Sequence, residues 1–297
     1  MNKYRAAALM LCCHLIAAPV VAQESPPRIR AIKAKGPVSL RPDRAYLLFR
    51  SDAPSLSPVF LRIPTDAETA SYEEARRNAF IKAEPGLIRK RQQLLAQKTE
   101  AEKAGLKFNK PIPPVPSLDT FDFAYDKIIN AQTVGMGSTF ERSDRDRTML
   151  LEALPGDYVL YGIGWNDIFE TCFCLGTVSF PAEAGKITDM GSLFIAGAGP
   201  QSDIPELAGE TGFGESSMSD FLPVWTAAIR PANASTKIPA LLVDKPIVPA
   251  AYRAQGKFVA GFSFAINRLA PIPGVLGYDR GKVIDLATGK VAPNQYD

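Results

Sequence analysis

Apolar and polar positions alternate most clearly between residues 154 and 195, where they predict three strands. A tight turn containing Pro155 and Gly156 precedes the first strand, because proline presets one backbone dihedral and glycine tolerates positive φ. A second apolar run, 168–180, is rich in strand-forming residues, and a third strand follows over 187–195. The rest of the chain is organised around this stretch.

Further strand-like runs lie on both sides of the central stretch. The opening part of the chain predicts two or three strands within residues 28–63, with a turn at 41–44. Phe121, Phe123 and Tyr125 alternate with other residues as a strand would. The closing part predicts short strands at 224–229, 238–243, 258–266, 274–278 and 282–286, the last two joined as a hairpin about Asp279, Arg280 and Gly281.

The pattern becomes helical between these two sets of strands. Capping-box sequences at 65–68 and 71–74 predict that a helix begins at one of them and ends near Glu84. Pro85 and Gly86 are expected to break or kink it, and a second helix is predicted over 87–104. The proline-rich run that follows, 111–117, predicts an extended linker.

Regular turns at strand-sized spacing favour packed sheets. The predicted fold class is mainly β: an antiparallel β-sandwich of the immunoglobulin or transthyretin-like kind, with an inserted helical hairpin. The expected domains are a signal peptide at 1–22, a β-sandwich at 23–195 with its helical insertion at about 65–117, an acidic glycine-rich loop at 196–223, and a C-terminal β segment at 224–297 that packs on the same core or forms a small second sheet.

Three short motifs carry a resemblance to a known class of module. They are LPGDYVLY at 154–161, FPAEAGK at 180–186 and DMGSLF at 189–194. This succession of turns resembles small bacterial β-sandwich modules of the carboxypeptidase-regulatory-like and PEGA type, and domains of envelope lipoproteins. The whole chain also resembles secreted proteins of alphaproteobacteria. The resemblance implies a β-sandwich and an exported protein, and it implies no mechanism.

Residues 1–22 have the pattern of a secretory signal peptide. Lys3 and Arg5 precede a short apolar core, and small residues end the segment, so cleavage is expected near Ala22. The localisation that follows is periplasmic or secreted. Two alternatives are a retained membrane anchor, which the short apolar core disfavours, and a lipid-attachment box ending at Cys12, which lacks the required small residue before the cysteine.

Cleavage would change the composition of the chain. Its one histidine, His14, lies within the leader, so the mature chain would contain none. That excludes histidine-based triads, zinc sites with histidine ligands and a histidine general base. Loss of Lys3 and Arg5 would leave 32 basic against 31 acidic residues, a net charge of +1. A nearly neutral chain offers no global field for nucleic acid, and no nucleic-acid partner is expected.

Cys172 and Cys174 would be the remaining thiols. If both lie on one strand, they face the same way with Cα atoms about 6.5–7 Å apart, at the upper limit for a disulfide, so a bond between them needs a bulge or a bend. The pair is therefore interpreted either as two buried, inert cysteines or as a strained structural disulfide. Metal binding and redox catalysis are weaker alternatives, because this spacing comes without the further ligands of a closed metal site.

Two segments are strongly biased in charge. The basic one carries Lys82, Arg89, Lys90, Arg91, Lys98, Lys103, Lys107 and Lys110 against three glutamates. The acidic one, 196–220, carries Asp203, Glu206, Glu210, Glu215 and Asp220 and no basic residue. Arg89, Lys90 and Arg91 are the candidate charge-docking surface, hypothesised to face the acidic segment within one molecule or between two. The alternatives are a solvated helix face and peripheral contact with an anionic membrane.

No sequence motif assigns a catalytic residue, a cofactor or a metal site. Neither the nucleophile elbow G-x-S-x-G nor S-x-x-K occurs in the chain. The favoured function is a non-catalytic binding or structural module of the bacterial envelope, with an envelope protein or a glycan as partner. The alternative is a hydrolase or carbohydrate-active enzyme that uses paired carboxylates, which need no histidine.

Overall fold

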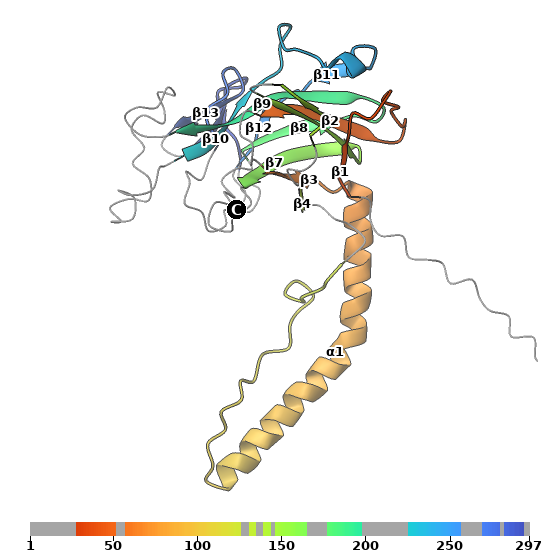
Figure 1. Ribbon diagram of the computed structural model, residues 1–297. Helices are drawn as coiled ribbons and strands as arrows, with labels where there is room; N and C mark the ends of the chain where they lie inside the picture. Colours follow the sequence, from red (N-terminus) through yellow and green to blue (C-terminus); the bar gives the residue numbers. More distant parts are fainter. Residues whose placement is uncertain are drawn as a thin grey trace, which may run out of the picture.

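The computed structural model describes residues 28–51, 57–125, 131–134, 139–143, 146–164, 177–197, 225–256, 269–279 and 282–293. This part of the chain is mainly β-structure, with three sheets and one long helix (Figure 1). The prediction of a mainly β protein is therefore confirmed. The predicted leader, Cys172, Cys174 and the acidic segment lie outside the described residues.

The largest sheet has seven strands and is mixed. Its main order is β1-β6-β2-β9-β10, with β5 beside β6 and β11 beside β9. Two pairings, β2 with β9 and β11 with β9, are parallel, whereas an antiparallel sheet was predicted. A parallel pair needs a long crossover, and more than a hundred residues separate β2 from β9. The strands are β1 (Arg30–Ile32), β2 (Ala45–Ser51), β5 (Glu141–Arg142), β6 (Arg147–Ala153), β9 (Ile187–Gly197), β10 (Trp225–Arg230) and β11 (Ile247–Pro249).

The other two sheets are antiparallel throughout. The five-stranded sheet has the order β12-β8-β7-β3-β4, and the three-stranded sheet has the order β13-β14-β15. The predicted hairpin about residues 279–281 is confirmed, since Asp279 pairs with Lys282. The strands are β3 (Ser57–Arg62), β4 (Ala131–Thr133), β7 (Gly156–Gly164), β8 (Val178–Ala182), β12 (Arg253–Ala254), β13 (Leu276–Asp279), β14 (Lys282–Asp285) and β15 (Lys290–Val291).

The main hydrophobic core takes side chains from all three sheets. Phe49 of β2, Phe60 of β3 and Phe180 of β8 are fully buried, and their rings meet edge to face at centroid distances of 6.2 and 6.5 Å. Such aromatic pairs stabilise the fold by about 0.5–1.5 kcal/mol each beyond their buried area. Every residue of β2 is buried, because Tyr46 and Leu48 on its opposite face enter a second core cluster. Because successive side chains of a strand point to opposite faces, β2 contributes side chains to both core clusters.

A single helix, α1 (Asp66–Lys103), replaces the predicted helical hairpin. It begins at the predicted capping box, where Thr65 accepts from the backbone N–H of Glu68 and the Glu68 carboxylate accepts from the backbone N–H of Thr65. Pro85 lies inside the helix and does not end it, although the helix changes direction about halfway along (Figure 1). No side chain of α1 is buried, so water can bond to the carbonyl of Ile81 that Pro85 leaves without a donor.

The helix extends away from the sheets as an arm of about 57 Å, at 1.5 Å per residue (Figure 1). Arg62, at the end of β3, is 3% exposed and anchors it through an ion pair with Glu68. The hydrogen bond from Arg62 is the main cause that lowers the pKa of the Glu68 carboxyl. The acid form of Glu68 is therefore disfavoured while the arm is attached.

Residues 106–125, the return segment, run back along the arm towards the sheets (Figure 1). The predicted strand at Phe121, Phe123 and Tyr125 is wrong, since this stretch joins no described sheet. Its alternation arises because an extended chain lies with one side on the helix. Tyr72 of α1 packs against Phe123 and Tyr125, at centroid distances of 5.9 and 5.5 Å, and Phe80 packs against Phe121 at 5.4 Å.

The predicted strand at 238–243 is also wrong, because Ala240–Leu242 form a short 3-10 helix, η2. Leu242 is fully buried in the second core cluster, whereas Leu241 and Val243 are exposed. Ala240 is also exposed, whereas alternation along a strand would bury it together with Leu242; the single turn after Pro239 places only Leu242 in the core.

Among the described residues, no helix combines the length and apolar character that a transmembrane span requires.

Candidate functional site

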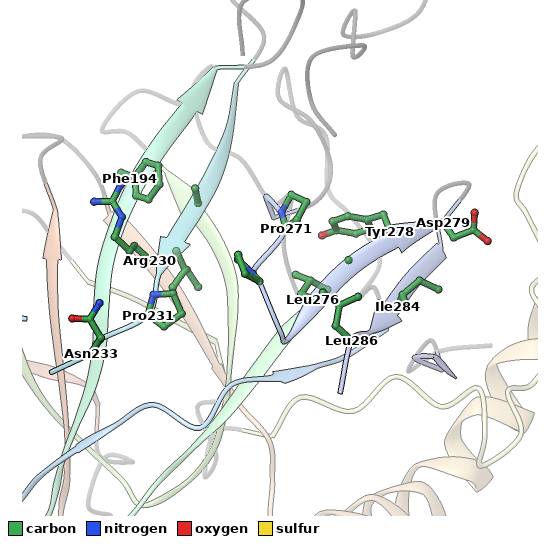
Figure 2. Close-up of a pocket in the computed structure, with 15 residues that line it drawn as sticks. Phe194, Arg230, Pro231, Asn233, Pro271, Leu276, Tyr278, Asp279, Ile284 and Leu286 are labelled. Atoms are coloured by element: carbon green, nitrogen blue, oxygen red, sulfur yellow. The ribbon is translucent and has the colours of Figure 1, made fainter. Parts of the chain in front are cut away.

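A groove separates the β9–β10 pair from the small β13–β14 hairpin (Figure 2). Its volume is about 1050 Å³, within the order of size that small-molecule and peptide sites require. One wall comes from β9, β10 and the residues just after β10, and the other from the chain around β13 and β14. We refer to this feature as the groove.

A close crossing at Gly191 shapes the first wall. Gly191 has φ of +80°, and a Cβ placed there would lie 2.1 Å from the carbonyl oxygen of Arg230. Only glycine permits both this conformation and this approach of the two backbones. The chain leaving β10 therefore passes directly over β9, and it carries Pro231, Ala232 and Asn233 into the groove wall.

A buried ion pair fixes the same wall from beneath. The Arg50 guanidinium donates to both carboxylate oxygens of Asp189, at 2.6 and 3.1 Å, and donates to the carbonyl of Lys237 at 2.7 and 3.2 Å. Asp189 also accepts from the backbone N–H of Gly191 at 2.9 Å. Both charged side chains are at least nine-tenths buried. The network joins β2, β9 and the loop after β10 into one unit.

Tyr252 also holds β9 in place next to this network. The Tyr252 hydroxyl donates to the carbonyl of Met190 at 2.8 Å, and its ring meets Phe180 edge to face at 5.7 Å. Burial raises the pKa of Tyr252 well above its ordinary value, and the nearby Asp189 charge raises it further. The hydroxyl is therefore a permanent donor at physiological pH.

The opposite wall is apolar and set by a tight contact within the hairpin. Leu276 is fully buried at its base, while Leu286 is 46% exposed beside it. The Cβ of any larger residue at Gly277 would lie 3.0 Å from the Leu286 side chain, so glycine leaves room for that leucine. Tyr278 donates from its hydroxyl to the carbonyl of Leu269 at 2.6 Å, which fixes its ring. Pro271 adds a rigid surface.

Charged groups lie towards opposite sides of this apolar surface. Arg230 lies over the ring of Phe194, with its guanidinium carbon 5.2 Å from the ring centroid. Asp279 lies on the β13–β14 side, and Leu276, Leu286 and Pro271 lie between the two in Figure 2. The arrangement suits a ligand that is apolar in its middle and carries polar or charged ends.

The groove reaches the edge of the largest sheet. Ala228 pairs with Phe194 and shares its face of the sheet, whereas Ile229 points to the other face and joins the main core. All three residues line the groove, so at the end of β10 the groove is lined by side chains from both faces of the sheet. No strand in the described part of the chain pairs with the outer edge of β10.

The residues proposed from the sequence lie elsewhere. Arg89, Lys90 and Arg91 are exposed on α1, and none of them has an ion pair with another described residue. The acidic segment that they were predicted to meet is outside the described residues, as are Cys172 and Cys174. No group of three or more histidine, cysteine, aspartate or glutamate side chains that could hold a metal ion gathers in the described part of the chain.

The groove was not predicted from the sequence. Its lining comes from four separated stretches, at 194, 228–233, 271–279 and 284–286. One signal was present: Pro231 directly follows β10, where proline ends a ladder, and Pro271 and Pro273 lie on the two sides of the bridge residue Ile272 shortly before β13.

Comparison with protein-family models, with curated proteins and with solved structures finds no match for this chain.

Proposed function

We propose that this chain is a non-catalytic binding module of the bacterial envelope, and that the groove binds an extended, apolar segment of a partner polypeptide. The observation that carries the proposal is an apolar groove at the outer edge of β10, an edge to which no described strand is paired. An added peptide strand would gain backbone hydrogen bonds from such an edge, and side-chain pockets beside it would give selectivity.

The lining favours a polypeptide over a glycan. A sugar ring is bound by exposed aromatic faces and by many hydrogen-bonding groups. In this groove, the face of Phe194 is covered by Arg230, and the hydroxyl of Tyr278 already donates to Leu269. Leucine and proline side chains make up the exposed middle, and they suit apolar peptide side chains. Arg230 and Asp279 would select polar or charged groups at the two ends of the segment.

The enzymatic alternative has less support. A carboxylate-pair mechanism requires two acidic side chains about 5–10 Å apart in one cleft. The groove has a single carboxylate, Asp279, and the smaller pocket described below has only Glu152. The binding module is therefore the better of the two proposals for the described residues.

The remaining expectations belong to the same proposal. The leader at 1–22 and the resemblance to bacterial envelope modules support a periplasmic or secreted location. The core shared by the two larger sheets supports an immunoglobulin or transthyretin-like sandwich as the finer description of the fold. Contact of the basic arm with an anionic membrane is a weaker possibility, since the exposed apolar side chains of α1 are few and aliphatic.

Site-specific photocrosslinking in a bacterial host tests the proposal. A photoreactive amino acid at Leu286, inside the groove, should crosslink to a defined peptide of another polypeptide, which mass spectrometry identifies. The matched control is the same amino acid at Val243, which is also exposed and aliphatic but lies outside the groove. A synthetic copy of the captured segment should then bind the purified chain, and Leu286→Arg should abolish that binding.

Three outcomes would count against the proposal. Crosslinks from Leu286 that match those from Val243 would mean that the groove selects nothing. Crosslinks confined to residues 257–268 of the same chain would mean that this chain fills its own groove. Crosslinks to saccharide alone would favour a glycan partner.

A further inference from the structure

Four arginines surround a small pocket near the edge of the largest sheet that lies farthest from β10. Arg28 lies just before β1 and Arg30 lies in it, and Arg41 and Arg44 come from the turn before β2. The end of β6 lies between them, because β6 pairs with β1 on one side and with β2 on the other. The pocket has a volume of about 210 Å³. We refer to it as the arginine pocket.

The pocket is held by fixed contacts beneath it. Arg30 lies within 3.0 and 3.1 Å of the two carboxylate oxygens of Glu152, which is 7% exposed. The hydroxyl of the fully buried Tyr46 donates to the same carboxylate at 3.4 Å and accepts from the backbone N–H of Arg41 at 2.7 Å. Burial is the largest cause that raises the pKa of Tyr46, so this hydroxyl keeps its proton. The turn that carries Arg41 and Arg44 is thereby tied to the core.

The positive charges of the pocket are only partly balanced. Arg30 is paired with Glu152, and Arg41 and Arg44 share Asp43, at 2.9 and 3.7 Å. Arg28 has no ion pair with a described residue. Four guanidinium groups against two carboxylates leave an excess of two positive charges. A ligand with two negative charges would compensate them.

The size and shape of the pocket narrow the class of ligand. A volume of about 210 Å³ is below the usual range for drug-sized ligands, about 300–1,000 Å³, so a single small group fits and a nucleotide does not. Guanidinium groups bind phosphate oxygens through paired, planar hydrogen bonds, and phosphate monoesters carry close to two negative charges at pH 7. Carboxylates carry only one.

We propose that Arg28, Arg30, Arg41 and Arg44 form a binding site for a phosphate group. The site is separate from the groove and does not depend on the function proposed for it. Glu152 positions Arg30 and is already bonded, while Arg28 and Arg44 supply the donors that face the ligand. The phosphate comes either from a small soluble monoester or from the headgroup of a lipid, and the same arginines would recognise both.

Calorimetric titration of the chain with O-phosphoserine tests the site directly. The structure predicts one equivalent bound, and an affinity that falls as the pH drops through about 6, where the phosphate monoester loses its second charge. Arg28→Gln and Arg44→Gln should each weaken binding about tenfold or more, because each removes charge-assisted hydrogen bonds. Arg28 is exposed, and Arg44 is partly buried but has only the exposed Asp43 as its ion-pair partner, so the variants are expected to fold. Arg89→Gln on the arm is the matched control and should bind as the unaltered chain does.

The source of the phosphate follows from a second titration. Vesicles of phosphatidylcholine with phosphatidic acid should bind the chain in an Arg44-dependent way if the headgroup is the ligand, whereas binding of O-phosphoserine without vesicle binding assigns a soluble monoester. The proposal is overturned if neither probe binds, if chloride competes as well as sulfate does, or if Arg89→Gln weakens binding as much as Arg28→Gln does. Each of those results would mean that these arginines form no specific phosphate site and contribute only to the general charge of the surface.

Discussion

Replacing Asp189 with asparagine removes the charge that balances Arg50 while the size of the side chain stays the same. In the native chain this carboxylate accepts two hydrogen bonds from Arg50 and one from the Gly191 backbone. The variant would leave a guanidinium that is 8% exposed without a counter-charge. Its hydrogen bonds to the Lys237 carbonyl would remain, and the amide oxygen of asparagine could accept one more, but neither acceptor carries a charge.

The expected cost follows from this burial. Breaking a buried ion pair by removing one partner costs about 3–5 kcal/mol, because the remaining charge stays desolvated. At about 2–4 °C per kcal/mol for a chain of this size, the melting temperature should fall by about 6–20 °C. Asp43→Asn is the matched control, because Asp43 pairs with Arg41 on the surface, where an ion pair is worth less than about 1 kcal/mol.

Circular dichroism during thermal and urea unfolding measures the effect. A double variant, Arg50→Met with Asp189→Leu, should recover most of the loss, since a well-packed apolar pair can replace a buried ion pair. Two results would contradict this prediction: Asp189→Asn melting within about 2 °C of the unaltered chain, or a double variant whose loss of stability equals or exceeds the sum of the losses of Arg50→Met and Asp189→Leu made singly.

Three other predictions follow from the fold. Gly191→Ala should destabilise the chain by about 3 kcal/mol or more, measured by urea unfolding, because its Cβ would overlap the Arg230 carbonyl at a positive φ; full stability would contradict the close crossing. The pKa of Glu68 is lowered in the folded state, so its contribution to anchoring the arm is present above its unfolded value of 4.5 and is lost as the pH falls through the folded value. The protection of amides in the first turn of α1, measured as the exchange rate relative to the intrinsic rate at each pH, should therefore fall in acid, and Glu68→Gln should show low protection at every pH; a loss of protection in acid that persists in that variant would exclude the anchor. Reversal of Arg89, Lys90 and Arg91 to glutamate should increase proteolytic cleavage within 196–220 at low salt if the two segments dock, and an unchanged cleavage pattern would refute the docking hypothesis.

Local signals in the sequence predicted the local features of the fold. The capping box at Thr65 gave the start of α1, because the bonds involved span only three residues. The hairpin about 279–281 was predicted because a tight turn is also local, and β7 and β9 were predicted from the pattern of neighbouring residues along each strand. The parallel pairing of β2 with β9 could not be predicted, because it depends on contacts between strands more than a hundred residues apart.

Two errors share a physical cause. Two helices were expected on the two sides of Pro85, which was predicted to break or kink the chain there, and the alternation at Phe121–Tyr125 was expected to mark a strand. Both rules assume that a segment packs in a closed core. On the exposed arm, water can reach the carbonyl that the proline leaves without a donor, and an extended chain lies on a helix instead of a sheet.

The two candidate sites differ in how much of each could have been predicted from the sequence. The arginine pocket draws its four arginines from one short stretch, 28–44, so their density there was a visible signal that was not used. The groove depends on the crossing at Gly191 and on the placement of the β13–β14 hairpin, which no local pattern determines.

Amide hydrogen exchange along β10 tests the central proposal most directly. The purified chain is compared with and without the segment captured by crosslinking at Leu286. If that segment adds to the sheet, those amides of Trp225–Arg230 that are not bonded to β9 should exchange at least tenfold more slowly in the complex. Unchanged exchange along β10 at saturating peptide would contradict the proposal that the groove and its strand edge form the binding site.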